Sequence, residues 1–247
     1  MPTEPTEPTE PTDDPTAHPS LTPVPNGDPM PVTSDPTPSP EPTADRAPVT
    51  LLTLLIDRSG SMEPLRGAVV EGANELLRGL EPRDRVTIVQ FDTQAPYEVI
   101  VDGLPAAEIP PLEYAQYQPR GGTPLLDAVG RAIAATTGRA REVEVLTGVR
   151  PTVVLGIVTD GYENSSVEYT AEQIRRLIGQ SREDGWTVTY AGIGMGDAAF
   201  AEAARLGIDR ARSSSVPSSR AGTHTAFAAL CVSIGDARDE RRRSDAS

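Results

Sequence analysis

The fold of this chain is decided by residues 51–61, LLTLLIDRSGS. The apolar first half is typical of a buried strand in a parallel sheet, because such strands are covered on both faces. Asp57 ends the run, and the hydroxyl side chains of Ser59 and Ser61 follow at alternate positions. One carboxylate and two hydroxyls near one point suit a hard cation such as Mg²⁺, which prefers oxygen ligands. Zinc is disfavoured, because it prefers Cys and His.

Apolar strand patterns alternate with helical patterns beyond this stretch. The predicted strands cover residues 49–57, 84–91, 97–101, 152–159, 186–193 and 211–216. The predicted helices cover residues 64–80, 124–136, 170–182, 197–206 and 219–234 or beyond. Strands joined through helices of this length pair in parallel under helices on both faces. The predicted fold class is therefore α/β, a three-layer doubly wound Rossmann-like fold with a mostly parallel central sheet and one antiparallel edge hairpin.

Two segments are harder to assign from the sequence. Residues 102–122 contain several prolines and are expected to form a long loop. Residues 138–150 fit either the end of a long helix or an insertion. Thr170 and Gln173 have the spacing of a capping box, and Asp197 is a candidate N-cap for the helix that follows it.

Composition divides the chain into three parts. Residues 1–48 begin with a Pro-Thr-Glu repeat, hold nine acidic residues and little apolar material, and are predicted to be a disordered tail. Residues 49–236 form the predicted domain, and residues 237–247 a charged C-terminal tail. The acidic segment is interpreted first as a solubilising spacer. Phosphorylation at its Thr-Pro and Ser-Pro sites, and autoinhibition by its glutamates, are two alternatives.

The overall composition excludes several classes of function. The net charge is -14, which disfavours nucleic acid as a partner because phosphate contacts need a basic surface. Cys231 is the single cysteine, so no internal disulfide can form. No apolar run approaches the roughly 20 residues of a membrane span. The first residues lack the pattern of a signal peptide, and we expect a cytoplasmic protein.

Three loops follow predicted strands or precede a predicted helix. They are residues 57–62 (DRSGSM), 120–125 (RGGTPL) and 158–164 (VTDGYEN). In open α/β sheets ligands bind beyond the carboxyl ends of the strands. Asp57 and Asp160 both lie at such ends, so two separate strands direct an aspartate at the same edge.

Taken together, the three loops resemble the metal-ion-dependent adhesion site of von Willebrand factor type A (vWA) domains. That pattern is D-x-S-x-S, then a Thr before a helix, then an Asp after a later strand. The resemblance covers roughly residues 49–235. It implies five residues at the metal: Asp57, Ser59, Ser61, Thr123 and Asp160.

The resemblance also implies a function. The expected ion is Mg²⁺, with Mn²⁺ and Ca²⁺ as alternatives, and the expected role is a protein–protein interaction module without catalytic residues. In such a module the cation accepts an Asp or Glu carboxylate from a partner protein. The chain is similar to stand-alone bacterial vWA proteins, including those associated with tellurite resistance.

Each motif also has a purely structural interpretation. Asp57 or Ser61 could cap the helix that begins near Pro64, and Thr123 could cap a helix with Pro124 at its first position. The residues around Asp160 could form a simple turn. We favour the metal interpretation because all three signals occur in the order of the family pattern.

The enzymatic alternative is a metal-dependent hydrolase or phosphatase on a Rossmann-like scaffold. Ser59 and Ser61 have no His beside them to act as a base, and the chain has no lysine for a phosphate-binding loop. Arg58 is expected either on the rim of the site or fully solvated. Glu163 and Asn164 are expected in a surface loop or at the rim, and neither His18 nor His224 is expected to take part.

Overall fold

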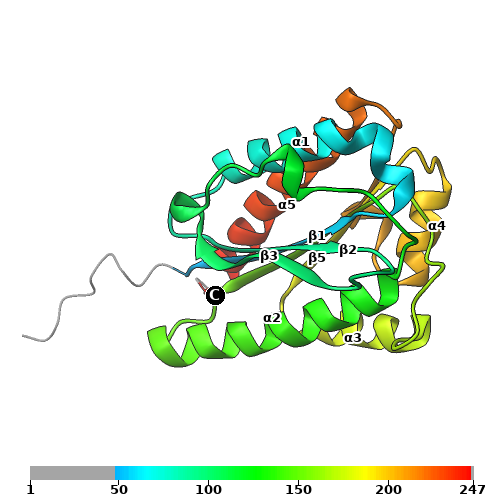
Figure 1. Ribbon diagram of the computed structural model, residues 1–247. Coiled ribbons are helices and arrows are strands. Elements are labelled where there is room, and N and C mark those ends of the chain that lie inside the picture. Colours follow the sequence, from blue (N-terminus) through cyan, green and yellow to red (C-terminus); the bar gives the residue numbers. More distant parts are fainter. Residues whose placement is uncertain (1–47, 246–247) are drawn as a thin grey trace, which may run out of the picture. The chain divides into compact units, whose positions relative to one another are not determined.

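The computed structural model describes residues 48–245. Except for Pro48, the predicted disordered tail over residues 1–48 lies outside the described residues. One sheet in the order β3-β2-β1-β4-β5-β6 forms the centre of the domain (Figure 1). Its strands are β1 (Thr50–Asp57), β2 (Arg85–Phe91), β3 (Glu98–Pro105), β4 (Thr152–Thr159), β5 (Thr187–Ile193) and β6 (Ser213–Val216).

The strands pair as predicted from the sequence. β1 runs parallel to both β2 and β4, and β5 runs parallel to β4 and β6. β3 is antiparallel to β2 and forms one edge of the sheet, as expected for a hairpin. This mostly parallel sheet with one antiparallel pair confirms the predicted fold class.

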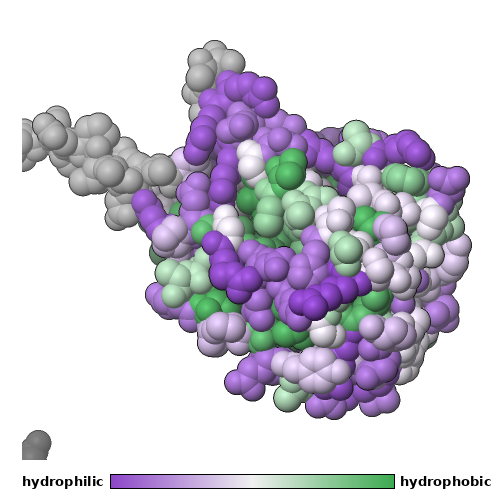
Figure 2. All heavy atoms as spheres, turned by 90° about the horizontal axis from the view of Figure 1, so that it is seen from above, coloured by the Kyte–Doolittle hydropathy of each residue, from purple (hydrophilic) through white to green (hydrophobic). Residues whose placement is uncertain are grey.

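Helices cover both faces of the sheet (Figure 1). They are α1 (Arg66–Arg78), α2 (Leu125–Thr147), α3 (Ala171–Glu183), α4 (Ala198–Arg205) and α5 (Arg220–Asp245). Helices α1 and α5 pack on one face, whereas α2, α3 and α4 contribute to the core on the other. No helix within residues 48–245 is long and apolar enough to cross a bilayer. Figure 2, seen from the α1 side, shows a hydrophilic surface interrupted by small apolar patches.

The two halves of the core follow from the period-two alternation of side chains along a strand. Leu52, Leu54 and Ile56 of β1 belong to the core beneath α1 and α5. Leu55 belongs to the core beneath α2 and α3. Because every residue of β1 is buried, the continuous apolar run in the sequence is the signature of the central strand.

The structure settles three segments that the sequence left undivided or open. A short 3₁₀ helix, Gly60–Leu65, precedes α1 and contains Pro64, which has no N–H to donate. Residues 138–147 continue α2, as in the first of the two predicted alternatives, and Gly148 directly after the helix has a left-handed conformation (φ 69°) that glycine adopts without strain. The predicted long loop over residues 102–122 includes the end of β3 and two short 3₁₀ helices.

The last helix is longer than the sequence analysis indicated. α5 continues through the charged segment that we predicted as a tail. Ala237 is buried, and Arg238 reaches Asp84 at the start of β2. These two contacts attach this part of the helix to the domain.

The predicted helix caps had different outcomes. The capping box of Thr170 and Gln173 is confirmed, because each side chain accepts a hydrogen bond from the other residue's backbone N–H. Asp197 precedes α4, but its side chain makes no capping hydrogen bond. That part of the prediction is wrong.

Candidate metal centre

The candidate site lies where the strand order reverses. From β1 the chain crosses through α1 to β2 on one side of the sheet and later returns through α2 to β4 on the other. This topology leaves a switch point between the carboxyl ends of β1 and β4, where open α/β sheets bind ligands. Ile56 pairs with Val158, so Asp57 at the end of β1 lies beside Thr159, and Asp160 follows directly.

Hydrogen bonds join the first and third loops. Ser59 Oγ lies 3.0 Å from Ser61 Oγ, and Ser61 Oγ donates to Asp160 Oδ1 at 2.7 Å. The Ser59 backbone N–H donates to Asp57 Oδ1 at 2.7 Å, and Thr159 Oγ1 donates to Asp57 Oδ2 at 2.6 Å. Four of the five predicted residues are therefore connected through these contacts at one point.

Thr123 completes the group through its packing against Gly161. A Cβ atom placed on Gly161 would lie 3.3 Å from Thr123 Oγ1 and 3.9 Å from Asp57 Oδ2. The absence of a side chain at residue 161 therefore leaves room beside both oxygens. Asn164 holds Thr123 in place, because its Oδ1 accepts from the Thr123 N–H and its own N–H donates to the Thr123 carbonyl.

The donor set fits a hard divalent cation. Octahedral Mg²⁺ with ligands at about 2.1 Å places neighbouring ligand oxygens about 3 Å apart. The contacts of Ser61 with Ser59 and Asp160, at 3.0 and 2.7 Å, are close to this spacing. Residues 48–245 contain no group of three or more His, Cys, Asp and Glu side chains that could hold a metal. A cation here would therefore depend on the hydroxyl oxygens.

Burial makes the two carboxylates costly when they are ionised. Removal from water raises the pKa of Asp57 from 3.8 to about 6, although hydrogen bonds from Thr159 and Ser59 oppose the shift. Burial also raises the pKa of Asp160. In the part of the chain that the structure describes, no basic side chain pairs with either aspartate. A cation between them would favour their ionised forms.

The capping interpretation of the motif is wrong. Ser59 precedes the 3₁₀ helix, Leu65 precedes α1 and Pro124 precedes α2. None of these positions has a side-chain capping hydrogen bond. The hydroxyls of Ser59 and Ser61 instead contact each other, and that of Ser61 donates to Asp160.

Arg58 lies neither on the rim nor in solvent, so both expectations for it are wrong. It is 4% exposed, and its Nε donates to Asp92 Oδ2 at 2.7 Å. It also contacts Gln90 and Glu98. The cause is the pairing of β1 with β2, because the Arg58 N–H donates to the Phe91 carbonyl, which places residue 58 beside the end of β2.

Two buried aspartates near the site were missed by the sequence analysis. Asp92 directly follows β2, as Asp160 follows β4, and this position was a signal that could have identified it. Asp127 in α2 accepts hydrogen bonds from the backbone N–H groups of residues 167–169. It thereby ties the loop after β4 to α2, and no pattern in the sequence indicated this role.

Glu163 and Asn164 lie in the loop that was expected at the surface, and they also support the site. Glu163 accepts from the Leu126 N–H at the start of α2, while Asn164 holds Thr123. His224 lies outside the site and contacts Glu71 and Glu75 of α1.

No protein-family model matches this chain, and no curated protein matches it. Several solved structures are similar to it. A von Willebrand factor type A structure from Catenulispora acidiphila has a TM-score of 0.56 at 17% identity, covering 76% of this chain and 43% of that chain. The proximal thread matrix protein 1 from the mussel byssus has a TM-score of 0.56 at 15% identity, covering 76% and 47%. This chain therefore spans less than half of either protein.

A third similar structure covers more of the related chain. The manganese-loaded TRAP protein of Plasmodium vivax has a TM-score of 0.52 at 17% identity, covering 76% of this chain and 74% of that one. These likenesses show the fold. The chain is an α/β protein with the fold of a von Willebrand factor type A domain.

Proposed function

We propose that this chain is a divalent-cation-dependent protein-interaction module. Its metal centre would consist of Asp57, Ser59, Ser61, Thr123 and Asp160. The observation that carries the proposal is the run of oxygens from Ser59 through Ser61 to Asp160, at 3.0 and 2.7 Å, at the switch point of the sheet. The bound cation would accept an Asp or Glu carboxylate from a partner protein.

The residues divide the work of the site between them. Asp57 and Asp160 supply the negative charge, and the serine and threonine hydroxyls supply neutral oxygens. Two carboxylates and three hydroxyls would supply five oxygens, and octahedral Mg²⁺ takes six, which leaves room for an incoming carboxylate. Mg²⁺ is the first candidate, with Mn²⁺ and Ca²⁺ as alternatives. The related TRAP structure is manganese-loaded, which supports a divalent ion at this fold.

We propose binding in preference to catalysis. The hydroxyls of Ser59 and Ser61 contact each other, and that of Ser61 donates to Asp160, so neither has a histidine base among these contacts. The similar structures include a thread matrix protein and a pilus adhesin from Lactobacillus rhamnosus. These names support a role in attachment. A cytoplasmic, bacterial setting akin to that of tellurite-resistance-associated vWA proteins remains part of the proposal and rests on the sequence resemblance.

Calorimetry tests the metal centre directly. The full chain is titrated with Mg²⁺ and Mn²⁺, beside Ser61→Ala, which removes one hydroxyl at an exposed position. Wild type is expected to bind one ion and the variant to bind it more weakly. Equal heats in both proteins would exclude this site.

A peptide pair tests the carboxylate acceptor. The metal-loaded protein is titrated with a short peptide that contains Asp, and with the same peptide containing Asn. The proposal expects binding of the Asp peptide only, and loss of that binding in EDTA. Binding of both peptides, or binding that persists in EDTA, would contradict it.

A further inference from the structure

Beside the candidate metal centre, at the carboxyl end of β2, lies a group of four charged side chains, two of them buried and two partly exposed. We call it the β2-end cluster; its members are Arg58, Asp92, Glu98 and Arg120. Asp92 is completely buried, and its Oδ2 accepts from Arg58 Nε at 2.7 Å and from Arg120 Nε at 3.1 Å. Glu98 adds contacts to Arg58 at 2.6 Å and to Arg120 at 3.8 Å. Two positive and two negative charges are thereby brought together.

The second oxygen of Asp92 is also used. Its Oδ1 accepts from the Gln94 N–H at 2.7 Å and from the Ala95 N–H at 3.0 Å. Burial alone would raise the pKa of Asp92, but these backbone hydrogen bonds and Arg58 lower it below its ordinary value. Asp92 therefore stays ionised, and its contacts fix both arginines relative to the turn after β2.

The two arginines belong to the loops that carry the candidate ligands. Arg58 lies between Asp57 and Ser59, and Arg120 precedes Thr123 by three residues. The main chains of these loops are joined as well. The Arg120 N–H donates to the Arg58 carbonyl at 2.8 Å, and residue 60 donates to the carbonyl of residue 121 at 3.1 Å. The side-chain contacts of both arginines with Asp92 add to these main-chain bonds between the two loops.

We propose that Asp92 is a positioning residue of the metal centre. By holding Arg58 and Arg120 together, it sets the first and second loops so that the hydroxyls of Ser59, Ser61 and Thr123 meet at one point. This inference rests on the proposed metal binding. Residues that orient metal ligands without touching the metal typically change its affinity about 10- to 100-fold when they are replaced.

Asp92 also balances charge near the site. Without its carboxylate, the cluster would retain two arginines and one glutamate. An uncompensated guanidinium would then lie beside a site that has to accept a cation, and like charges repel. Loss of position and loss of charge balance both predict weaker cation binding in an Asp92 variant.

The opposite end of the same strand offers a matched control. Asp84 directly precedes β2, is as buried as Asp92, and pairs with Arg238. Its Oδ2 also accepts a backbone hydrogen bond, from the Glu81 N–H at 2.8 Å. Asp84→Asn therefore removes the same kind of buried, arginine-paired charge from the far end of the sheet.

The experiment is calorimetric titration of the full chain with Mn²⁺, in wild type, Asp92→Asn and Asp84→Asn, with melting in EDTA measured for all three. We expect about 10- to 100-fold weaker binding in Asp92→Asn and wild-type affinity in Asp84→Asn, although both lose thermal stability without metal. Wild-type affinity in Asp92→Asn would overturn the inference. So would equal weakening in both variants, which would mark a general effect of stability.

Arg120→Lys covers the case in which Asp92→Asn does not fold. The Arg120 side chain is 41% exposed, so this variant keeps the charge and alters the contacts with Asp92 and Glu98. A loss of affinity smaller than that expected for Asp92→Asn supports positioning independently of charge, and unchanged affinity overturns it. If wild type itself binds no Mn²⁺ or Mg²⁺, the proposed function fails first. If wild type binds the ion and the variants bind it equally well, the proposed function stands and only the positioning role of Asp92 fails.

Discussion

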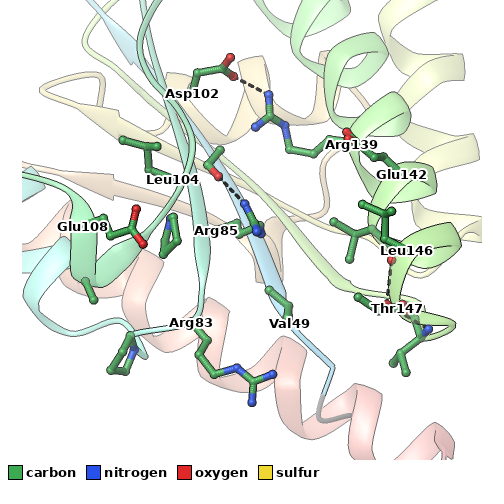
Figure 3. Close-up of a pocket in the computed structure, with 16 residues that line it drawn as sticks. Val49, Arg83, Arg85, Asp102, Leu104, Glu108, Arg139, Glu142, Leu146 and Thr147 are labelled. Atoms are coloured by element: carbon green, nitrogen blue, oxygen red, sulfur yellow. Dashed lines mark hydrogen bonds and ion pairs between the residues drawn. The ribbon is translucent and has the colours of Figure 1, made fainter. Parts of the chain in front are cut away.

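The candidate metal centre and the cavity at the opposite end of the sheet differ in whether their aspartates have arginine partners. At the carboxyl end, Asp57 and Asp160 approach each other without a basic partner among the described residues. At the amino end, a cavity of about 790 Å³ lies between β3 and the last turns of α2. There, Asp102 of β3 has an arginine partner, and Figure 3 shows Arg139 of α2 reaching it.

This comparison teaches that the pairing of charges, and not the presence of a cavity, sets the candidate site apart. In the cavity, the carboxylate of Asp102 already has the guanidinium of Arg139 as a partner. At the candidate metal centre, two carboxylates with raised pKa values lie beside hydroxyl oxygens. Two carboxylates without a basic partner favour a bound cation, which is the ligand that we propose.

The largest expected effect is the loss of metal binding at the carboxyl end. Asp160→Asn keeps an oxygen near Ser61 but removes one of the two negative charges. Because loss of a residue that only supports a ligand costs about 10- to 100-fold, we expect at least about 100-fold weaker Mn²⁺ binding by calorimetry. Asp102→Asn at the amino end is the control. If the two variants lose affinity equally, the comparison fails.

A smaller effect is expected from filling the space beside Thr123. Gly161→Ala places a methyl group 3.3 Å from Thr123 Oγ1, so the threonine has to shift. We expect about 10-fold weaker cation binding, in the range typical of residues around a metal site. Gly138→Ala in α2 is the matched change, because its methyl group meets no atom within 4 Å. It should raise stability by about 0.5–1 kcal/mol and leave binding unchanged.

The pH dependence of stability tests the pairing of Asp92. The folded-state pKa of Asp92 is lowered from its ordinary value of 3.8, so its contribution to stability is fully present above about pH 4. That contribution is lost as the pH falls through the lowered pKa, because protonation of Asp92 removes the charge that pairs with Arg58. Urea unfolding of wild type and Asp92→Asn should show a difference that shrinks below pH 4. A constant difference would argue against an ionised Asp92.

The smallest effect is expected at the cavity. Arg139→Gln breaks the ion pair with Asp102, whose side chain is 70% exposed. Exposed ion pairs are worth about 0–1 kcal/mol, so thermal unfolding should change little and metal affinity not at all. A clear drop in metal affinity would show that the two ends of the sheet are coupled.

Much of the fold could be predicted from the sequence because its signals are local. The continuous burial of β1 and β4 appears as apolar runs, and the cap of α3 appears as Thr170 with Gln173 three residues later. The length of α5 could not be predicted in this way. Its charged end is helical through contacts such as that of Arg238 with Asp84, which lies 154 residues away in the chain.

The candidate site divides along the same line. Its five predicted ligands could be named from the sequence, because each follows a strand or precedes a helix within a short motif. The residues that surround these five could not be predicted from the sequence. Arg58 was expected near solvent, and its burial depends on Asp92 and Glu98 from other strands.

By itself, the sequence determined the order of strands and helices and the residue types at the carboxyl edge, because apolar runs and turn residues act over a few positions. The tertiary structure decided which charges are paired. Whether Arg58 is solvated or held by Asp92, and whether Asp57 meets a cationic partner, depends on segments brought together only by folding. Coulomb energies depend on distance in space and on burial, and neither quantity is written in the local sequence.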